Sequence, residues 1–159
     1  MPLNLDYSTQ SEIAIEGMVA DSAIVRETRG KQAVANITAG KFVKLDATGL
    51  KFEVVSDAAD VTFGATRWSP SMVTPEGATV ATYKQDTQCP IVTEGSLWVY
   101  CNAAVADPQA KLYAIISGSN QGRVSPTASG TTTTAAVCKA DGMTTSAAGL
   151  VRVKLVQTL

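Results

Sequence analysis

The sequence contains no histidine, and this removes the side chain that proteins use most often as a general base and metal ligand. Every nucleophile that depends on a neighbouring imidazole is excluded with it. Four aspartates, Asp57, Asp60, Asp86 and Asp107, are scattered over expected turns, without the paired spacing of an acid and a base. We therefore predict that the protein is not an enzyme and has no catalytic residue, cofactor or metal site.

Charged residues are also scarce. They make up 17% of the 159 residues, and the formal net charge is -1. Such a balance gives no overall attraction to nucleic acid or to an anionic membrane surface. No basic run and no known RNA- or DNA-binding phrase is present. We predict neither nucleic acid nor membrane as a partner.

Cysteines are few and lack the C-x-x-C spacing of metal and redox sites: they are Cys89, Cys101 and Cys138. Buried, unpaired thiols in a reducing compartment are the expected state. The first ten residues have neither the basic nor the apolar region of a signal peptide, and no apolar run approaches the length of a membrane span. These features predict synthesis in the cytoplasm.

What the sequence does contain is a succession of short β-patterns separated by turn residues. Residues 42–45 and 50–55 flank a turn, and residues 150–156 alternate between apolar and basic side chains. No window has the period of an amphipathic helix with caps. The pattern predicts an all-β protein, an antiparallel β-barrel or jelly-roll-like domain.

The rest of the chain is organised around residues 61–101, whose second half, residues 91–101, is rich in β-forming residues. Two runs, residues 91–93 and 96–100, are joined by Glu94-Gly95, which predicts a two-residue hairpin. One face of this hairpin would carry Val92, Leu97 and Val99, and the other Ile91, Trp98 and Tyr100. Because both faces are apolar, we expect burial on both sides.

The first 25 residues differ from the rest of the chain, because they are acidic and contain no lysine or arginine. Apolar residues alternate without a turn to a local partner. One interpretation is an extended arm that adds a strand to a neighbouring subunit; the other is an ordinary first strand with a frayed start. The arm is favoured for residues 1–11, and the two interpretations are balanced for residues 12–25. We predict an arm over residues 1–25 and a single β-barrel domain over residues 26–159.

Five phrases in order resemble the structural cement proteins that decorate the capsids of tailed bacteriophages. They are EGMVADSA (residues 16–23), ITAGKFVKLD (37–46), TFGATRW (62–68), VTEGSLWVYC (92–101) and KLYAIISG (111–118). The resemblance implies a β-barrel or jelly-roll domain, commonly trimeric, that binds the major capsid protein on the outer surface of the shell where capsomers meet. It implies synthesis in the cytoplasm of a bacterial host and no catalytic activity or cofactor.

A binding protein of this kind needs exposed apolar contacts. The capsid or subunit interface is predicted to include Leu3, Leu5, Tyr7, Ile13, Ile15, Met18, Trp68 and Trp98. The alternative function is a carbohydrate-binding or adhesin-like module on a virion, in which Trp68, Trp98, Tyr83 and Tyr100 would line a groove. Packing in the core or at a subunit interface is the simpler explanation for these aromatic residues.

Overall fold

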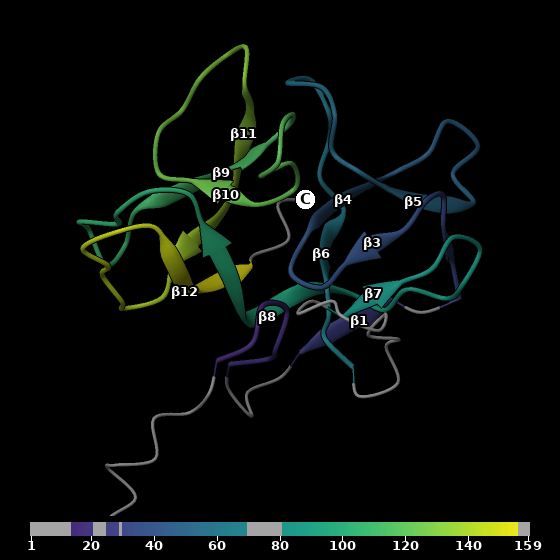
Figure 1. Ribbon diagram of the computed structural model, residues 1–159, viewed down its shortest axis with the longest axis horizontal. Helices are drawn as coiled ribbons and strands as arrows, with labels where there is room; N and C mark the ends of the chain where they lie inside the picture. Colours follow the sequence, from purple (N-terminus) through teal and green to yellow (C-terminus); the bar gives the residue numbers. More distant parts are fainter. Residues whose placement is uncertain (1–13, 21–24, 29, 70–80, 156–159) are drawn as a thin grey trace, which may run out of the picture.

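The computed structural model describes residues 14–20, 25–28, 30–69 and 81–155. Regular structure in these ranges is entirely β-strand, which confirms the all-β prediction, and Figure 1 shows two lobes side by side. The strands are β1 (Arg26–Thr28), β2 (Gln32–Ala33), β3 (Ile37–Thr38), β4 (Phe42–Leu45), β5 (Lys51–Val54), β6 (Gly64–Thr66), β7 (Thr82–Tyr83), β8 (Ile91–Cys101), β9 (Lys111–Ile115), β10 (Val124–Ser125), β11 (Thr133–Ala140) and β12 (Gly149–Leu155). Among the described residues, no helix is long and apolar enough to cross a membrane.

Strands β8 to β12 form a closed barrel. Their order is β10-β9-β11-β12-β8, and a further pairing of β10 with β8 closes the ring. The closing pair is parallel and the others are antiparallel, so the barrel is mixed. Its interior is filled by buried apolar side chains, among them Leu97, Val99, Cys101, Leu112, Ala114, Val124, Val151 and Val153. The predicted last strand is confirmed as β12, with Lys154 exposed opposite this core.

The second lobe continues the same sheet beyond β8 in the order β6-β4-β5-β2, while β1 pairs with β8 and β3 with β7. The predicted hairpin is present as β4 and β5, with a tight turn between them. Along β4, Phe42 faces the core shared with the barrel, and Val43 faces a second core. That second core comprises Ala33, Ile37, Ala39, Val43, Phe52, Tyr83, Cys89 and Ile91. The sheet is therefore covered on both faces.

The predicted hairpin at residues 91–100 is wrong, because these residues form the single long strand β8. Glu94 pairs with Arg26 of β1, whereas Gly95 pairs with Leu155 of β12, so the chain continues instead of reversing. The pairing with β1 skips Thr93, and Gly95 has a φ of 125°. A bulge of this kind adds one residue and bends the strand. It lets β8 pass from one lobe into the other.

The bulge also explains why Val92, Leu97 and Val99 lie on one face, as predicted, although the predicted hairpin is absent. It shifts the alternation by one residue, so Val92 and Leu97 lie in the same core although five positions separate them. Ile91 packs on the opposite face in the second core. Burial on both faces of this segment was therefore predicted correctly from an incorrect turn.

All three cysteines are free and buried, as predicted. Burial raises the pKa of the Cys89 thiol to about 12, and it raises the pKa of Cys101 and of Cys138 as well. A thiol that stays protonated is a poor nucleophile and a poor metal ligand. The cysteines act as small apolar side chains of the two cores.

Candidate interface at the N-terminal junction

Residues 14–20 lie against the middle of β8 in the same chain, and we call this contact the N-terminal junction. The Ile15 carbonyl accepts a hydrogen bond from Met18 N at 2.9 Å, which closes a turn with Gly17 at its third position. Gly17 has a φ of 85°, where a side chain is strained. A Cβ at this position would lie 2.6 Å from Gly40 N, so the turn packs closely on the body.

The main chain of Gly17 and Met18 forms hydrogen bonds with the main chain of Trp68 and Trp98. Gly17 N donates to the Trp98 carbonyl at 2.7 Å, and the Gly17 carbonyl accepts from Trp68 N at 2.7 Å. Trp98 N donates to the Met18 carbonyl at 2.8 Å, and Val19 bridges antiparallel to Leu97. β12 pairs with residues 95–101 along one edge of β8. The N-terminal junction pairs with residues 96–98 along the opposite edge. Residues 17–20 therefore lie beside β8 in the manner of an additional short strand.

A charged pair fixes the junction to the barrel. The Arg123 guanidinium donates to both oxygens of Glu16, from Nε at 3.0 Å and from Nη2 at 2.9 Å. Both side chains are largely buried, with 12% of Glu16 and 23% of Arg123 exposed. The guanidinium also lies 4.3 Å from the ring centroid of Tyr100. Paired donation and stacking on an aromatic ring are geometries that arginine provides and lysine does not.

Lys41 completes the cluster. Its Nζ donates to the Gln121 carbonyl at 2.8 Å. Burial, followed by repulsion from Arg123, lowers the pKa of Lys41 from 10.5 to about 8, although Glu16 opposes the shift. The carboxylate of Glu16 thus balances the positive charges of both Arg123 and Lys41. Its removal would leave two neighbouring cations that repel each other.

The structure places half of the predicted interface residues here. Trp68 and Trp98 are brought together by the junction, and both are partly buried. Met18 is partly buried beside them, and Ile15 is 37% exposed. The remaining predicted residues, Leu3, Leu5, Tyr7 and Ile13, lie outside the described residues, as do residues 1–13 and 21–24 of the arm predicted over residues 1–25.

Three aromatic residues of the carbohydrate-binding alternative, Trp68, Tyr83 and Tyr100, are engaged in internal contacts. Tyr83 is buried, and its hydroxyl donates to the Arg67 carbonyl at 2.7 Å. Tyr100 lies under Arg123, and neither described groove beside the loop of residues 58–63 is lined by any of the four predicted aromatics. This arrangement favours packing over sugar stacking.

Sequence reasoning missed the charged half of the junction. Glu16 and Arg123 are 107 positions apart in the sequence, and Arg123 follows a turn rich in glycine, serine and asparagine at residues 117–122. No local signal pairs two such residues. Gly17 gave a clue that was not used, because glycine is the residue that most readily supplies the positive φ that some turns require.

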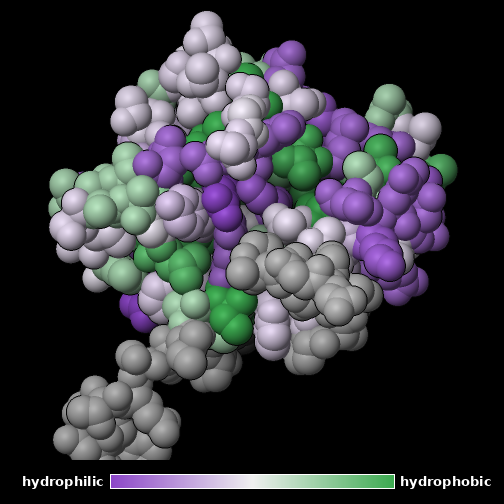
Figure 2. All heavy atoms as spheres, viewed as in Figure 1, coloured by the Kyte–Doolittle hydropathy of each residue, from purple (hydrophilic) through white to green (hydrophobic). Residues whose placement is uncertain are grey.

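The described part of the chain holds no cluster of three or more metal-ligating side chains. Exposed large apolar residues among the described positions are limited to Ile15, Leu50 and Val61. In Figure 2 the visible face mixes hydrophilic and hydrophobic residues, with hydrophilic ones concentrated over the lobe of β4 and β5. The described residues thus define an all-β protein built on a closed β-barrel.

The chain belongs to the phage family described as "Structural cement protein (E217 gp24/Pam3 gp6)", whose profile matches residues 4–156. Its role is therefore structural and associated with the capsid, in agreement with the resemblance seen in the sequence. Among solved structures, a chain of "The capsid of Myoviridae Phage XM1" is similar in fold, with a TM-score of 0.73 and 17% identity. The similarity covers 96% of this chain and 97% of that one. The comparison with curated protein sequences finds no match.

Proposed function

We propose that the protein binds the outer surface of the assembled phage capsid at the junctions between capsomers and stabilises the shell as a homotrimer, without catalysis. The observation that carries this proposal is the family match over residues 4–156. In the groove lined by Glu53 and Asp60, both carboxylates are ion-paired with Lys44, and no metal-ligand cluster is present in the described ranges. Its partner is the major capsid protein, and its place is the exterior of the virion.

The proposed attachment element is the N-terminal arm, which we now confine to residues 1–13. Residues 14–20 are bonded to β8 of their own chain, so they serve as the root of the arm. Thirteen residues span at most about 45 Å when extended, enough to leave the domain. The apolar residues Leu3, Leu5 and Tyr7 would dock by strand addition on a capsid subunit.

The first test measures oligomeric state and binding together. Light scattering of the purified chain should give the mass of a trimer, and the protein should sediment with empty capsids. A monomer that stays in the supernatant at all concentrations would overturn the proposal.

The second test separates the arm from the domain. A chain lacking residues 1–13 should fold normally but lose co-sedimentation with capsids. A full-length variant with Leu3, Leu5 and Tyr7 replaced by serine should behave like the deletion. Its matched control carries Asn4→Ser, Ser8→Ala and Gln10→Ser on the same segment and should still bind. Normal decoration by the deletion variant would show that the domain alone attaches.

A further inference from the structure

A row of lysines crosses neighbouring strands of the barrel. Lys139 on β11 pairs directly with Lys111 on β9 and with Lys154 on β12. All of them are exposed. Residues that pair directly across two strands project from the same face of the sheet, with their Cβ atoms about 4.5–5.5 Å apart. The side chains of Lys111, Lys139 and Lys154 therefore emerge together, and we call them the lysine row.

The lysine row lies on the outer face of the barrel. The residues next to it along the strands are buried in the barrel core: Leu112, Cys138, Ala140, Val153 and Leu155. Because side chains alternate between the two faces of a strand, the lysines point away from this core. The row thus stands on paired strands and not on a loop.

The arrangement is unfavourable for the isolated protein. Like charges directly opposite each other in a sheet repel, and lysine is depleted in strands. Lysine is common at open sheet edges, where it blocks pairing with other chains. Here Lys139 is paired on both sides, and Lys154 lies between Lys139 and Ser96 of β8. Edge protection therefore does not explain the row.

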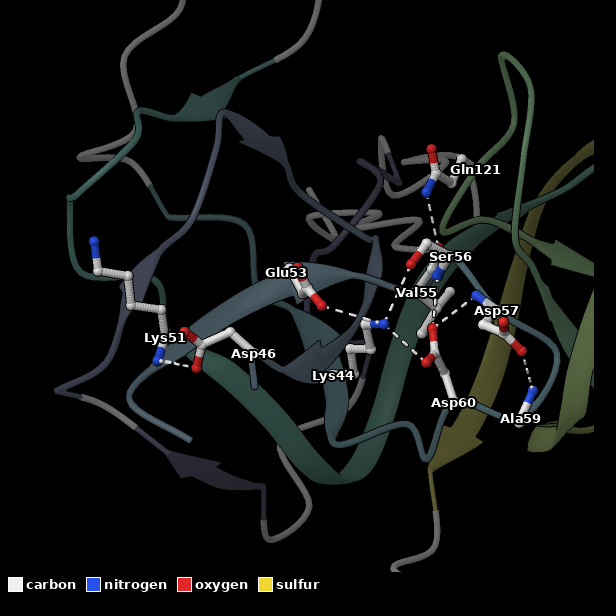
Figure 3. A network of polar contacts seen from close by, with 10 residues as sticks. All are labelled: Lys44, Asp46, Lys51, Glu53, Val55, Ser56, Asp57, Ala59, Asp60 and Gln121. Carbon is white, nitrogen blue, oxygen red and sulfur yellow. Dashed lines mark hydrogen bonds and ion pairs between the residues drawn. The ribbon is translucent and has the colours of Figure 1, made fainter. Parts of the chain in front are cut away.

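Other cations of the described ranges have counter-charges of their own. In the second lobe, Lys44 pairs with Glu53 at 3.1 Å and with Asp60 at 2.8 Å, as Figure 3 shows. Further ion pairs are Arg26–Glu94, Lys51–Asp86, Arg67–Glu27, Arg123–Glu16 and Arg152–Asp141. Lys31 and Lys41 each donate to a main-chain carbonyl. Among the described lysines and arginines, only Lys84 and the lysine row form neither kind of contact.

The acidic residues closest to the row in the sequence have other partners. Asp141 accepts a hydrogen bond from Ser96 Oγ at 2.9 Å and pairs with Arg152 at 3.3 Å. Asp107 accepts a hydrogen bond from Gln109 N at 2.8 Å. Within the part of the chain that the structure describes, the lysine row is therefore left without a counter-charge.

We propose that the lysine row docks on an acidic patch of a capsid subunit, which makes the outer face of β9, β11 and β12 a second contact with the shell beside the N-terminal arm. This inference rests on the proposed function. Charge complementarity identifies the partner, because a few carboxylates on a protein surface can neutralise a short row of ammonium groups. Nucleic acid fits less well, since proteins that bind it through charge contact about 6–10 phosphates, and the net charge of this chain is -1.

Such a contact would orient the protein on the shell. Complementary charges raise the rate of association and fix the register of docking more than they raise affinity. Docking also relieves the repulsion within the lysine row, so the row favours the bound state over the free one.

Binding to empty capsids tests the proposal with the full-length chain. One variant combines Lys111→Gln, Lys139→Gln and Lys154→Gln, and co-sedimentation gives its dissociation constant. The variant should bind about tenfold more weakly than the native chain at low salt. The difference should shrink towards about 0.5 M salt, because screening removes the attraction that the row supplies.

The matched control removes the same amount of charge from the second lobe. It combines Arg26→Gln, Lys51→Gln and Lys84→Gln; Arg26 and Lys51 belong to solvent-accessible ion pairs, with 70% and 39% of their side chains exposed. Pairs of this kind contribute little to stability, so the control should fold. It should bind capsids within about twofold of the native chain.

Equal affinity of the lysine-row variant and the native chain would overturn the proposal and leave the proposed function intact. Equal weakening by both variants would also overturn it, because the effect would then follow net charge and not the row. Row-dependent affinity for double-stranded DNA, with unchanged binding to capsids, would assign the row to nucleic acid instead. A native chain that does not sediment with capsids contradicts the proposed function and this proposal with it.

Amine labelling provides a measurement that needs no variant. When the native chain is bound to capsids, the lysine row should react with an amine-specific reagent several-fold more slowly than in the free chain. Lys84 is the internal control and should react at the same rate in both states. Unchanged labelling of the lysine row on capsids would contradict docking, whether or not the variants fold.

Discussion

At the scale of single residues, the position of the N-terminal segment depends on Glu16. Its carboxylate accepts two hydrogen bonds from Arg123 and offsets the repulsion between Arg123 and Lys41. Removing one partner of a largely buried pair leaves the other charge poorly solvated, which costs more than the pair itself contributes. The cluster is therefore the most sensitive charged site at the junction.

Replacing Glu16 with Gln should lower the free energy of unfolding by about 1–3 kcal/mol. The neutral amide cannot compensate two nearby cations, and urea denaturation measures the loss. Glu94→Gln is the matched control, because Glu94 pairs with Arg26 at 3.2 Å with both side chains well exposed. The control should change stability by less than about 0.5 kcal/mol. Equal effects of the two substitutions would show that the Glu16 pair has no special role.

Lys41 should give the protein an unusual pH dependence. Its folded-state pKa is about 8, below the ordinary 10.5, so from about pH 8 to about pH 10.5 the unfolded chain binds more protons than the folded chain. The contribution of Lys41 to stability must therefore rise with pH across this window, by at most about 1.4 kcal/mol per pH unit. Urea midpoints of the native chain and of Lys41→Met, compared from pH 7.5 to 10, isolate this contribution.

The difference between the native chain and Lys41→Met should change steadily over that range. Lys139→Met, which removes an exposed lysine on β11, is the control and should leave the pH profile of the native chain intact. A constant difference between the native chain and Lys41→Met would mean that burial of this amine has no energetic consequence.

At the scale of elements, strands with local partners were predictable. β12 follows from its alternation, because Val151 and Val153 must face one side of a strand and Arg152 and Lys154 the other. The hairpin of β4 and β5 follows from a turn in which Asp46 accepts from Leu50 N and Lys51 N, each at 3.0 Å. In both cases the residues that decide the structure are neighbours in the sequence.

The course of β8 could not be predicted in this way. Glu94-Gly95 has the chemistry of a hairpin turn and equally that of a bulge, since Gly95 adopts a positive φ in either case. The choice is made by distant partners, namely β1 beside residues 91–94 and β12 beside residues 95–101. The sequence around Glu94 and Gly95 does not indicate which strands will pair with the two halves of β8.

The close pairing of β6 with β8 gives a prediction for a single glycine. A Cβ at Gly64 would lie 2.3 Å from the Val92 carbonyl oxygen and 2.7 Å from Ile91 Cγ2. Gly64→Ala should therefore lower the free energy of unfolding by about 1–3 kcal/mol, because the backbone of β8 must move. Gly149→Ala on β12 is the control, since a Cβ there meets nothing within 4 Å. The control should stay within about 0.5 kcal/mol in thermal or urea unfolding.

At the scale of the whole molecule, the site was only half predictable. Apolar and aromatic residues were selected by type, and the main chains of Trp68 and Trp98 each bond to Gly17 at the junction, but their role in an interface stays a prediction. The Glu16–Arg123 pair that fixes the junction depends on closure of the barrel, which brings Arg123, just before β10, next to Glu16. Contacts of this kind depend on how the strands are arranged in space, so they cannot be predicted from the composition of the chain.

A protein that binds the assembled shell, and not its separated subunits, stabilises the shell by mass action. At a free concentration 100 times the dissociation constant, each site contributes about 2.7 kcal/mol, and the contribution grows with the logarithm of concentration. The disruption temperature of empty capsids should therefore keep rising after the sites are filled, and scanning calorimetry at increasing cement concentration measures it. If the protein attaches as the proposed homotrimer, release on dilution should also be slow, because all three copies must detach together. Capsids that sediment with the protein yet show an unchanged disruption temperature would separate binding from cementing and contradict the proposed function.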